Sequence, residues 1–191
     1  MKFSSFRSSL LQGAFCVACA GVASADMTTV GSVGIVDTAD TAKIVTDGNS
    51  VTLSFAQPGQ QNATVRYNVS LVPEVPSTGI TAWTLKVLYQ DGDPPTAETQ
   101  RLLVHLKELE LSTGLETTVL TSDSNVQLLV GNESDWLVQT VSGCRGYHPD
   151  SAYFLEAIFI SDATPFAPPL RLGGMALNAG TIGDVDDEAC T

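Results

Sequence analysis

The stretch Ala63-Thr64-Val65-Arg66-Tyr67-Asn68-Val69-Ser70-Leu71 decides the fold class of this protein. Every apolar side chain in it falls on an odd number and every polar one on an even number. A period of two is that of a β-strand with one face on a core and the other in solvent. The stretch therefore predicts a half-buried strand.

Other stretches repeat the pattern. Residues 83–90 place Trp83 and three further apolar residues on odd positions, and 51–55 is a shorter instance. Residues 153–160 are almost continuously apolar, aromatic and β-branched, which predicts a central strand covered on both faces, with Glu156 directed to an edge or a partner. Trp83 shares its phase with apolar neighbours, so we expect it in the core.

Turn-forming residues separate these runs at short intervals, for example Asp47-Gly48-Asn49 and Gly143 to Asp150. Many short strands separated by polar turns that contain Gly and Pro are typical of two packed sheets. We predict an all-β protein: one antiparallel β-sandwich, jelly-roll or Ig-like, with about eight to ten strands.

Residues 96–114 allow two interpretations. Leu102, Leu103, Leu106 and Leu109 are spaced as on a helix, with Pro95 before the segment and Gly114 at its end. The sequence from 109 to 120 instead suggests a β-hairpin, with a bulge near Lys107-Glu108 that shifts the alternation. The neighbouring strands favour the hairpin.

The N-terminal segment has the form of a secretory signal. Lys2 and Arg7 precede an apolar run from Leu10 to Val22, and Ala23-Ser24-Ala25 offers a small-residue cleavage site. The run is too short to span a bilayer, which needs about 20 residues. We expect residues 1–25 to be removed and 26–191 to form one domain, secreted, periplasmic or on the cell surface. Cys16 and Cys19 keep lipidation open as an alternative, although neither follows a fitting motif.

The net charge of the chain and the positions of its basic residues disfavour some classes of binding partner. The formal net charge is −12, and loss of Lys2 and Arg7 with the signal moves it to −14. The remaining Lys and Arg residues are scattered, whereas nucleic acids and anionic lipids are bound by clustered ones. We expect no nucleic-acid partner and no membrane insertion of the mature chain; a glycan or another extracellular protein is the expected partner.

Two cysteines remain after cleavage, Cys144 and Cys190. Exported chains mature in an oxidising compartment, so we expect a disulfide between them. The alternative is two unpaired thiols.

The loop after Cys144 gathers several recognition groups. Arg145, Tyr147, His148 and Asp150 offer a guanidinium, a phenol, an imidazole and a carboxylate within six residues. We expect this loop to contact a ligand, and Trp136 is a further candidate because an indole face suits a sugar ring. An ordinary turn is the alternative for the loop, and core packing is the alternative for the tryptophan.

Motifs for catalysis are missing from the sequence. There is no Gly-x-Ser-x-Gly, no His-Glu-x-x-His, no Cys-x-x-Cys after the signal and no glycine-rich phosphate loop. We expect no cofactor, although Asp91 with Asp93, or the acidic run at 184–188, could ligate calcium. The sequence thus favours a non-enzymatic binding or surface-associated domain. A pilin-like or other assembly subunit, with an alternating strand over Thr28 to Val36 donated to a neighbour, is the alternative. An exported hydrolase with a carboxylate site comes third.

Overall fold

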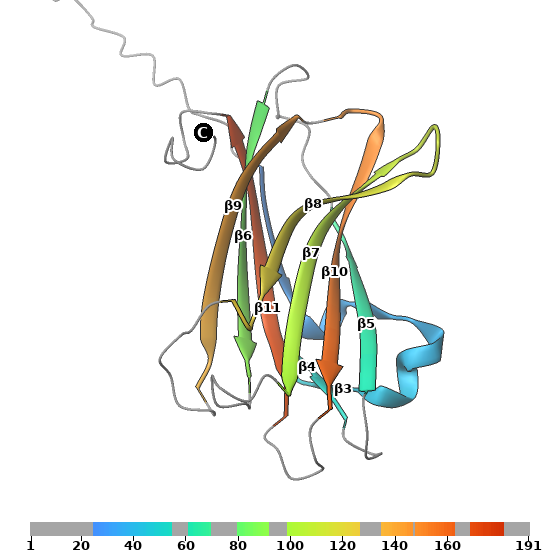
Figure 1. The fold of residues 1–191 in the computed structure, drawn as a ribbon, viewed down its shortest axis with the longest axis vertical. Coiled ribbons are helices and arrows are strands. Elements are labelled where there is room, and N and C mark those ends of the chain that lie inside the picture. Colours follow the sequence, from blue (N-terminus) through green and yellow to red (C-terminus); the bar gives the residue numbers. More distant parts are fainter. Residues whose placement is uncertain are drawn as a thin grey trace, which may run out of the picture.

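The protein is described by a computed structural model covering residues 25–54, 61–69, 80–91, 99–126, 135–146, 148–162 and 169–181. Within them lie eleven strands and two short 3-10 helices: β1 (Ala25–Val30), η1 (Gly31–Val33), β2 (Ile35–Val36), η2 (Thr38–Lys43), β3 (Ile44–Asp47), β4 (Ser50–Leu53), β5 (Gln61–Asn68), β6 (Ile80–Gln90), β7 (Gln100–Glu110), β8 (Glu116–Asp123), β9 (Leu137–Gly146), β10 (Ser151–Ser161) and β11 (Arg171–Thr181). They form two antiparallel sheets packed face to face (Figure 1).

The strand order is that of a jelly roll. Sheet A runs β3-β4-β11-β6-β9, with β1 also paired to β11, and sheet B runs β2-β5-β10-β7-β8. From β4 to β11 consecutive strands alternate between the sheets, apart from the β7–β8 hairpin, and these eight strands form the double-sheet jelly roll. The β-sandwich predicted from the sequence is thus confirmed. Short strands β1 to β3 take the total just above the expected number.

Alternating side chains build the core between the sheets. Ala63, Val65 and Tyr67 of β5 are buried, while Arg66 and Asn68 are exposed, as the opening stretch of sequence predicted. The same holds along β6, where Trp83 is fully buried. Sheet B contributes Leu102, Val104, Leu106, Leu155 and Phe159, each at most 2% exposed.

Strand β10 is central in sheet B, as predicted, but its two faces differ. One face lies in the core, while the other carries Glu156 beside β5 and β7. Lys107 Nζ lies 2.6 Å from one Glu156 oxygen, and Arg66 Nη2 lies 3.1 Å from the other. These two cations cover the carboxylate, which is only 4% exposed. Glu156 therefore finds partners within its own sheet.

Residues 100–123 form the β7–β8 hairpin, so the helical alternative is wrong. The register shifts between Leu106 and Lys107, close to the predicted bulge. Leu106 pairs with Leu120 and Lys107 with Thr118, which places the extra residue, Val119, in β8. Strand β7 itself keeps one phase to its end, so Glu108 follows Leu106 on the core-facing side and is 4% exposed.

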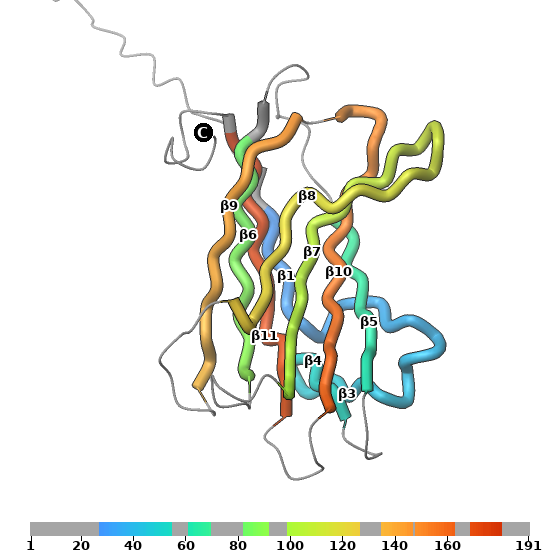
Figure 2. Tube along the Cα trace, viewed as in Figure 1, coloured from blue at the N-terminus to red at the C-terminus, as the bar shows by residue number. Residues whose placement is uncertain are grey.

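The N-terminal segment crosses from one sheet to the other, as Figure 2 shows. The single strand expected over Thr28 to Val36 is therefore wrong: β1 pairs with β11 in sheet A, and β2 pairs with β5 in sheet B. Gly31 permits the crossing, because a Cβ there would lie 2.1 Å from the carbonyl oxygen of Leu172. The Tyr67 hydroxyl donates to the Gly31 carbonyl at 2.7 Å and fixes the crossing point.

Side chains join the two long edge strands, β8 of sheet B and β9 of sheet A. Gln139 of β9 donates to the Asp123 carbonyl at 3.1 Å, and the Ser122 hydroxyl donates to the Gln139 side-chain oxygen. Ser122 and Gln139 are both buried. We call this pair of contacts the β8–β9 clasp.

Several expectations fall on residues outside the described ranges. Of the signal segment only Ala25 is described, at the start of β1. Cys144 lies in β9, but Cys190 lies outside the described residues, so the disulfide stays a prediction. None of the helices in the described ranges has the length and apolar character needed to cross a membrane.

Candidate ligand-binding pocket

A pocket opens at the end of the sandwich where β7 turns into β8 and β9 leads toward β10, the upper end in Figure 1. Its volume is about 430 Å³. The lining comprises Glu108, Glu110, Leu115, Thr117, Arg145, His148, Pro149, Asp150 and Ser151. Both sheets therefore contribute, together with the turn before β10.

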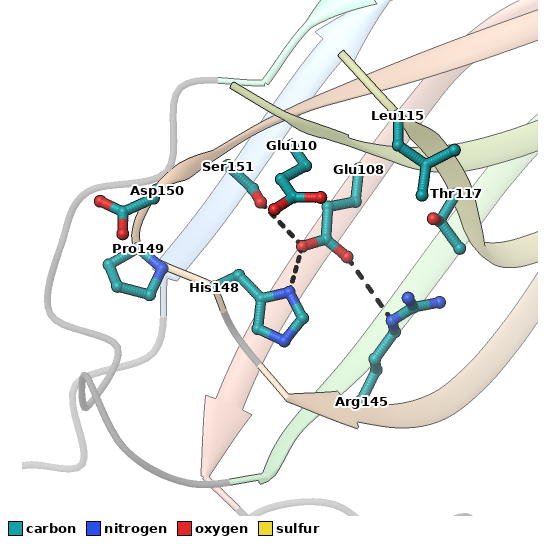
Figure 3. A pocket seen from close by; sticks show the side chains of 9 residues that line it. All are labelled: Glu108, Glu110, Leu115, Thr117, Arg145, His148, Pro149, Asp150 and Ser151. Atoms are coloured by element: carbon teal, nitrogen blue, oxygen red, sulfur yellow. Dashed lines mark hydrogen bonds and ion pairs between the residues drawn. The ribbon is translucent and has the colours of Figure 1, made fainter. Parts of the chain in front are cut away.

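Glu108 lies at the centre of this pocket, with three donor groups around its carboxylate (Figure 3). One oxygen accepts from His148 Nδ1 at 2.5 Å and from the Ser151 hydroxyl at 2.9 Å. The other oxygen lies 3.5 Å from Arg145 Nε. A buried carboxylate is costly unless it is paired and hydrogen-bonded, and here both conditions hold. Glu108 thus ties the end of β9, the turn and the start of β10 to β7.

Aromatic residues of the core hold the turn before β10 in place. The Tyr153 ring packs against Trp83 with centroids 5.1 Å apart, and its hydroxyl accepts from the His148 backbone N–H at 3.1 Å. Ser151 N–H donates to the His148 carbonyl at 3.1 Å, which closes the turn. The pocket wall is therefore anchored on buried aromatic packing.

Several polar groups at the pocket remain available to a ligand. The His148 side chain is 59% exposed, and its Nε2 has no partner among the described residues. The Arg145 side chain is 36% exposed beyond its contact with Glu108. Asp150 is exposed and adds a carboxylate. The pocket therefore offers both donors and acceptors, as an orienting site for a polar ligand requires.

Glu110 supplies a second carboxylate at the rim. The hydroxyls of Thr113 and Ser112 donate to it at 2.7 and 2.9 Å. These bonds, Thr113 first, lower the pKa of the Glu110 carboxyl, and the nearby His148 adds to the effect. The rim therefore keeps its negative charge under mildly acidic conditions.

The structure brings together three of the five residues expected to contact a ligand. Arg145, His148 and Asp150 all line the pocket, while Tyr147 lies outside the described residues. Trp136 precedes the opposite end of β9, about 30 Å from Arg145 at the rise of an extended strand. It is 46% exposed, and its indole lies against Gly173, whose missing Cβ leaves room for the ring.

Sequence reasoning missed the residue at the centre of the pocket. Glu108 lay where a shift of the alternation was expected, so its side chain was not placed on the core face. The available signal was the unbroken even-numbered series Leu102, Val104, Leu106, which puts position 108 on the same face. Thr117 gave no signal, because only the fold brings β8 to this loop; Ser151 directly follows the loop, but its residue type did not mark it as part of a site.

The calcium sites suggested by the sequence fall largely outside the described residues. Asp93 and the acidic run 184–188 lie there, and only Asp91 is described. Within the described ranges no group of three or more His, Cys, Asp or Glu side chains is arranged to hold a metal ion.

Comparison with known proteins assigns this chain to no family. No protein-family model and no curated protein matches this sequence. Among solved structures, the Eiger TNF of S. frugiperda is 9% identical, with a TM-score of 0.44 over 86% of this chain and 96% of its own. A family 16 carbohydrate-binding module is 15% identical, with a TM-score of 0.34 over 74% of this chain and 85% of its own. The N-terminal modules of a Clostridium thermocellum endo-1,4-β-D-xylanase, complexed with xylohexaose, are 12% identical with a TM-score of 0.40; the match covers 85% of this chain and 27% of theirs.

Proposed function

We propose that this protein is an exported, non-enzymatic binding domain that takes a ligand in the pocket around Glu108. The observation that supports this most is the pocket itself: a buried carboxylate holds an imidazole and a guanidinium in place, and each keeps an exposed part toward the opening. Pockets of a few hundred Å³ with a few oriented polar groups are the usual form of small-ligand sites.

The chemistry of the lining favours a ligand rich in hydroxyl groups, such as the end of a glycan. A hydroxyl both donates and accepts, and so it can use the Asp150 carboxylate and the Arg145 guanidinium together. Three carboxylates line the pocket against one guanidinium and one imidazole, which disfavours an anionic ligand. Leu115 and Pro149 add apolar wall for the carbon face of a sugar ring.

Export is supported by the sequence of the first 25 residues. Intact mass of protein recovered outside the cytoplasm should show a chain beginning at Asp26. Recovery of the full-length chain, or of a lipid-modified Cys19, would contradict this part of the proposal.

A glycan array with matched variants tests the ligand and its place together. The wild-type protein should bind at least one glycan, and His148→Ala should weaken binding about tenfold, the effect of one lost hydrogen bond with its orientation. Trp136→Ala is the control, because this exposed side chain lies at the other end of β9. Thermal unfolding of all three proteins shows whether they remain folded.

Two results of this experiment would change the proposal. Loss of binding in Trp136→Ala with retention in His148→Ala would move the ligand site to the far end of the sandwich. If the protein bound no glycan but captured a defined protein, the ligand would be a protein rather than a glycan.

A further inference from the structure

We infer that Glu108 is a positioning residue that fixes the tautomer of His148, so that the pocket presents Nε2 as an acceptor to an O–H group of its ligand. This inference rests on the proposed function for its ligand, but its statement about Glu108 concerns the unliganded protein alone.

The proton on His148 is assigned from the groups around Glu108. The carboxylate faces three groups that can donate, namely His148 Nδ1, the Ser151 hydroxyl and Arg145 Nε. An ionised carboxylate can only accept, so the 2.5 Å contact requires a hydrogen on Nδ1. In the neutral imidazole Nε2 then carries the lone pair, and in Figure 3 this nitrogen points away from Glu108, on a side chain that is 59% exposed.

The same carboxylate also orients the guanidinium. Its second oxygen meets Arg145 Nε, which leaves the terminal nitrogens for other partners; one of them donates to the Thr118 carbonyl at 3.5 Å. Glu108 is fixed because it continues the core face of β7 and is 4% exposed. One rigid anchor therefore sets two recognition groups that come from different segments of the chain.

This arrangement selects for a free hydroxyl. An O–H can donate to Nε2 of His148 and accept from the guanidinium of Arg145. An ether oxygen at the same place can only accept, and would leave the Nε2 lone pair without a donor. Sites built around a hydroxyl in this way discriminate strongly against the analogue that lacks it.

The tautomer can be measured directly because the chain has only two histidines, His105 and His148. We would record 15N spectra of the imidazoles in wild type, Glu108→Gln and Glu110→Gln, across a titration from about pH 5 to about pH 10 so that the neutral form is observed. Wild type should show His148 with the proton on Nδ1. In Glu108→Gln this preference should be lost, because the new amide can donate as well as accept. Glu110→Gln is the matched control: it removes a rim carboxylate that bonds Ser112 and Thr113, and it should leave the tautomer of the neutral His148 ring unchanged.

A wild-type spectrum with the proton on Nε2 would overturn the inference, and this result needs no variant to fold. A Glu108→Gln protein with a lower unfolding midpoint but an unchanged tautomer would also overturn it, since Glu108 would then be only structural.

The ligand side is tested with a set of methyl glycopyranosides and their per-O-methylated counterparts. The free glycosides should shift the His148 Nε2 resonance, and the methylated ones should not. Equal shifts from both sets would contradict the preference for a hydroxyl. No shift from either would contradict the saccharide ligand of the proposed function, while the tautomer would still decide the role of Glu108.

Discussion

Replacement of Glu156 by Gln isolates the contribution of one buried charge on the outer face of sheet B. Glutamine keeps the shape and one acceptor oxygen but removes the charge that faces Lys107 and Arg66. Hydrogen bonds to charged groups contribute about 1.5–3 kcal/mol each. The Arg66 side chain is 52% exposed and can be rehydrated, whereas that of Lys107 is 19% exposed, so mainly the Lys107 contact counts. We expect a loss of about 2 kcal/mol at pH 7, or about 4–8 °C in Tm for a chain of this size.

The loss should depend on pH. Burial raises the pKa of the Glu156 carboxyl, but the bonds and charges of Lys107 and Arg66 outweigh it and hold the pKa below its usual value of 4.5. A carboxyl with a lowered folded-state pKa stabilises the protein fully above its unfolded value, and this stabilisation disappears as the pH falls through the folded-state pKa. The gap between wild type and Glu156→Gln should therefore be constant near neutral pH and shrink below about pH 4.5.

Urea unfolding of both proteins from about pH 3 to about pH 7 measures this gap. Glu116→Gln is the control, because that side chain is 49% exposed and lies 3.6 Å from the same lysine; it should cost no more than about 1 kcal/mol. A gap that is the same at pH 3 and pH 7, or none at pH 7, would refute the account of Glu156.

Three further changes test the fold. Gly31→Ala places a Cβ 2.1 Å from the Leu172 carbonyl oxygen, and should destabilise by about 3 kcal/mol or more, read from urea unfolding; a loss below about 1 kcal/mol would argue against the close approach. Phe159→Ala opens a cavity at a fully buried site and should cost about 3–5 kcal/mol in the same assay, so a near-neutral change would contradict its place in the core. Trp136→Phe should leave only the emission of buried Trp83, blue-shifted and poorly quenched by acrylamide; strong residual quenching would place Trp83 at the surface.

The β-sandwich could be predicted from the sequence because period-two alternation is a local property that is visible within each strand. The odd positions from 63 to 67 of β5 and from 83 to 89 of β6 could be assigned to the core from sequence alone, and the structure buries them. The crossing at Gly31 could not be predicted, because it depends on the approach of Leu172, which lies 141 positions away. Local periodicity carries no information about such a contact.

Only the part of the pocket that is local in sequence could be predicted, because the sequence pattern carries no information about contacts between distant residues. Arg145, at the end of β9, and His148 and Asp150, in the turn after it, lie within six residues, so their proximity in sequence already implied a cluster. Glu108 reaches them from another strand, and its place depended on whether β7 or β8 carried the extra residue of the bulge. The end of β7 favoured a shift, because Glu108 interrupts the even-numbered apolar series and Leu109 is apolar, whereas the structure keeps the phase and buries the carboxylate.

The β8–β9 clasp has a consequence for how this protein meets other copies of itself. An unpaired strand edge is a template on which another chain can add a strand. Here the two long edges, β8 and β9, lie against one another through buried side chains, and the opposite edges are formed by shorter strands, β2 in sheet B and β1 and β3 in sheet A. Damage at Ser122 or Gln139 would open two long edges at once. We therefore expect loss of the β8–β9 clasp to cause association between molecules rather than local unfolding within one molecule.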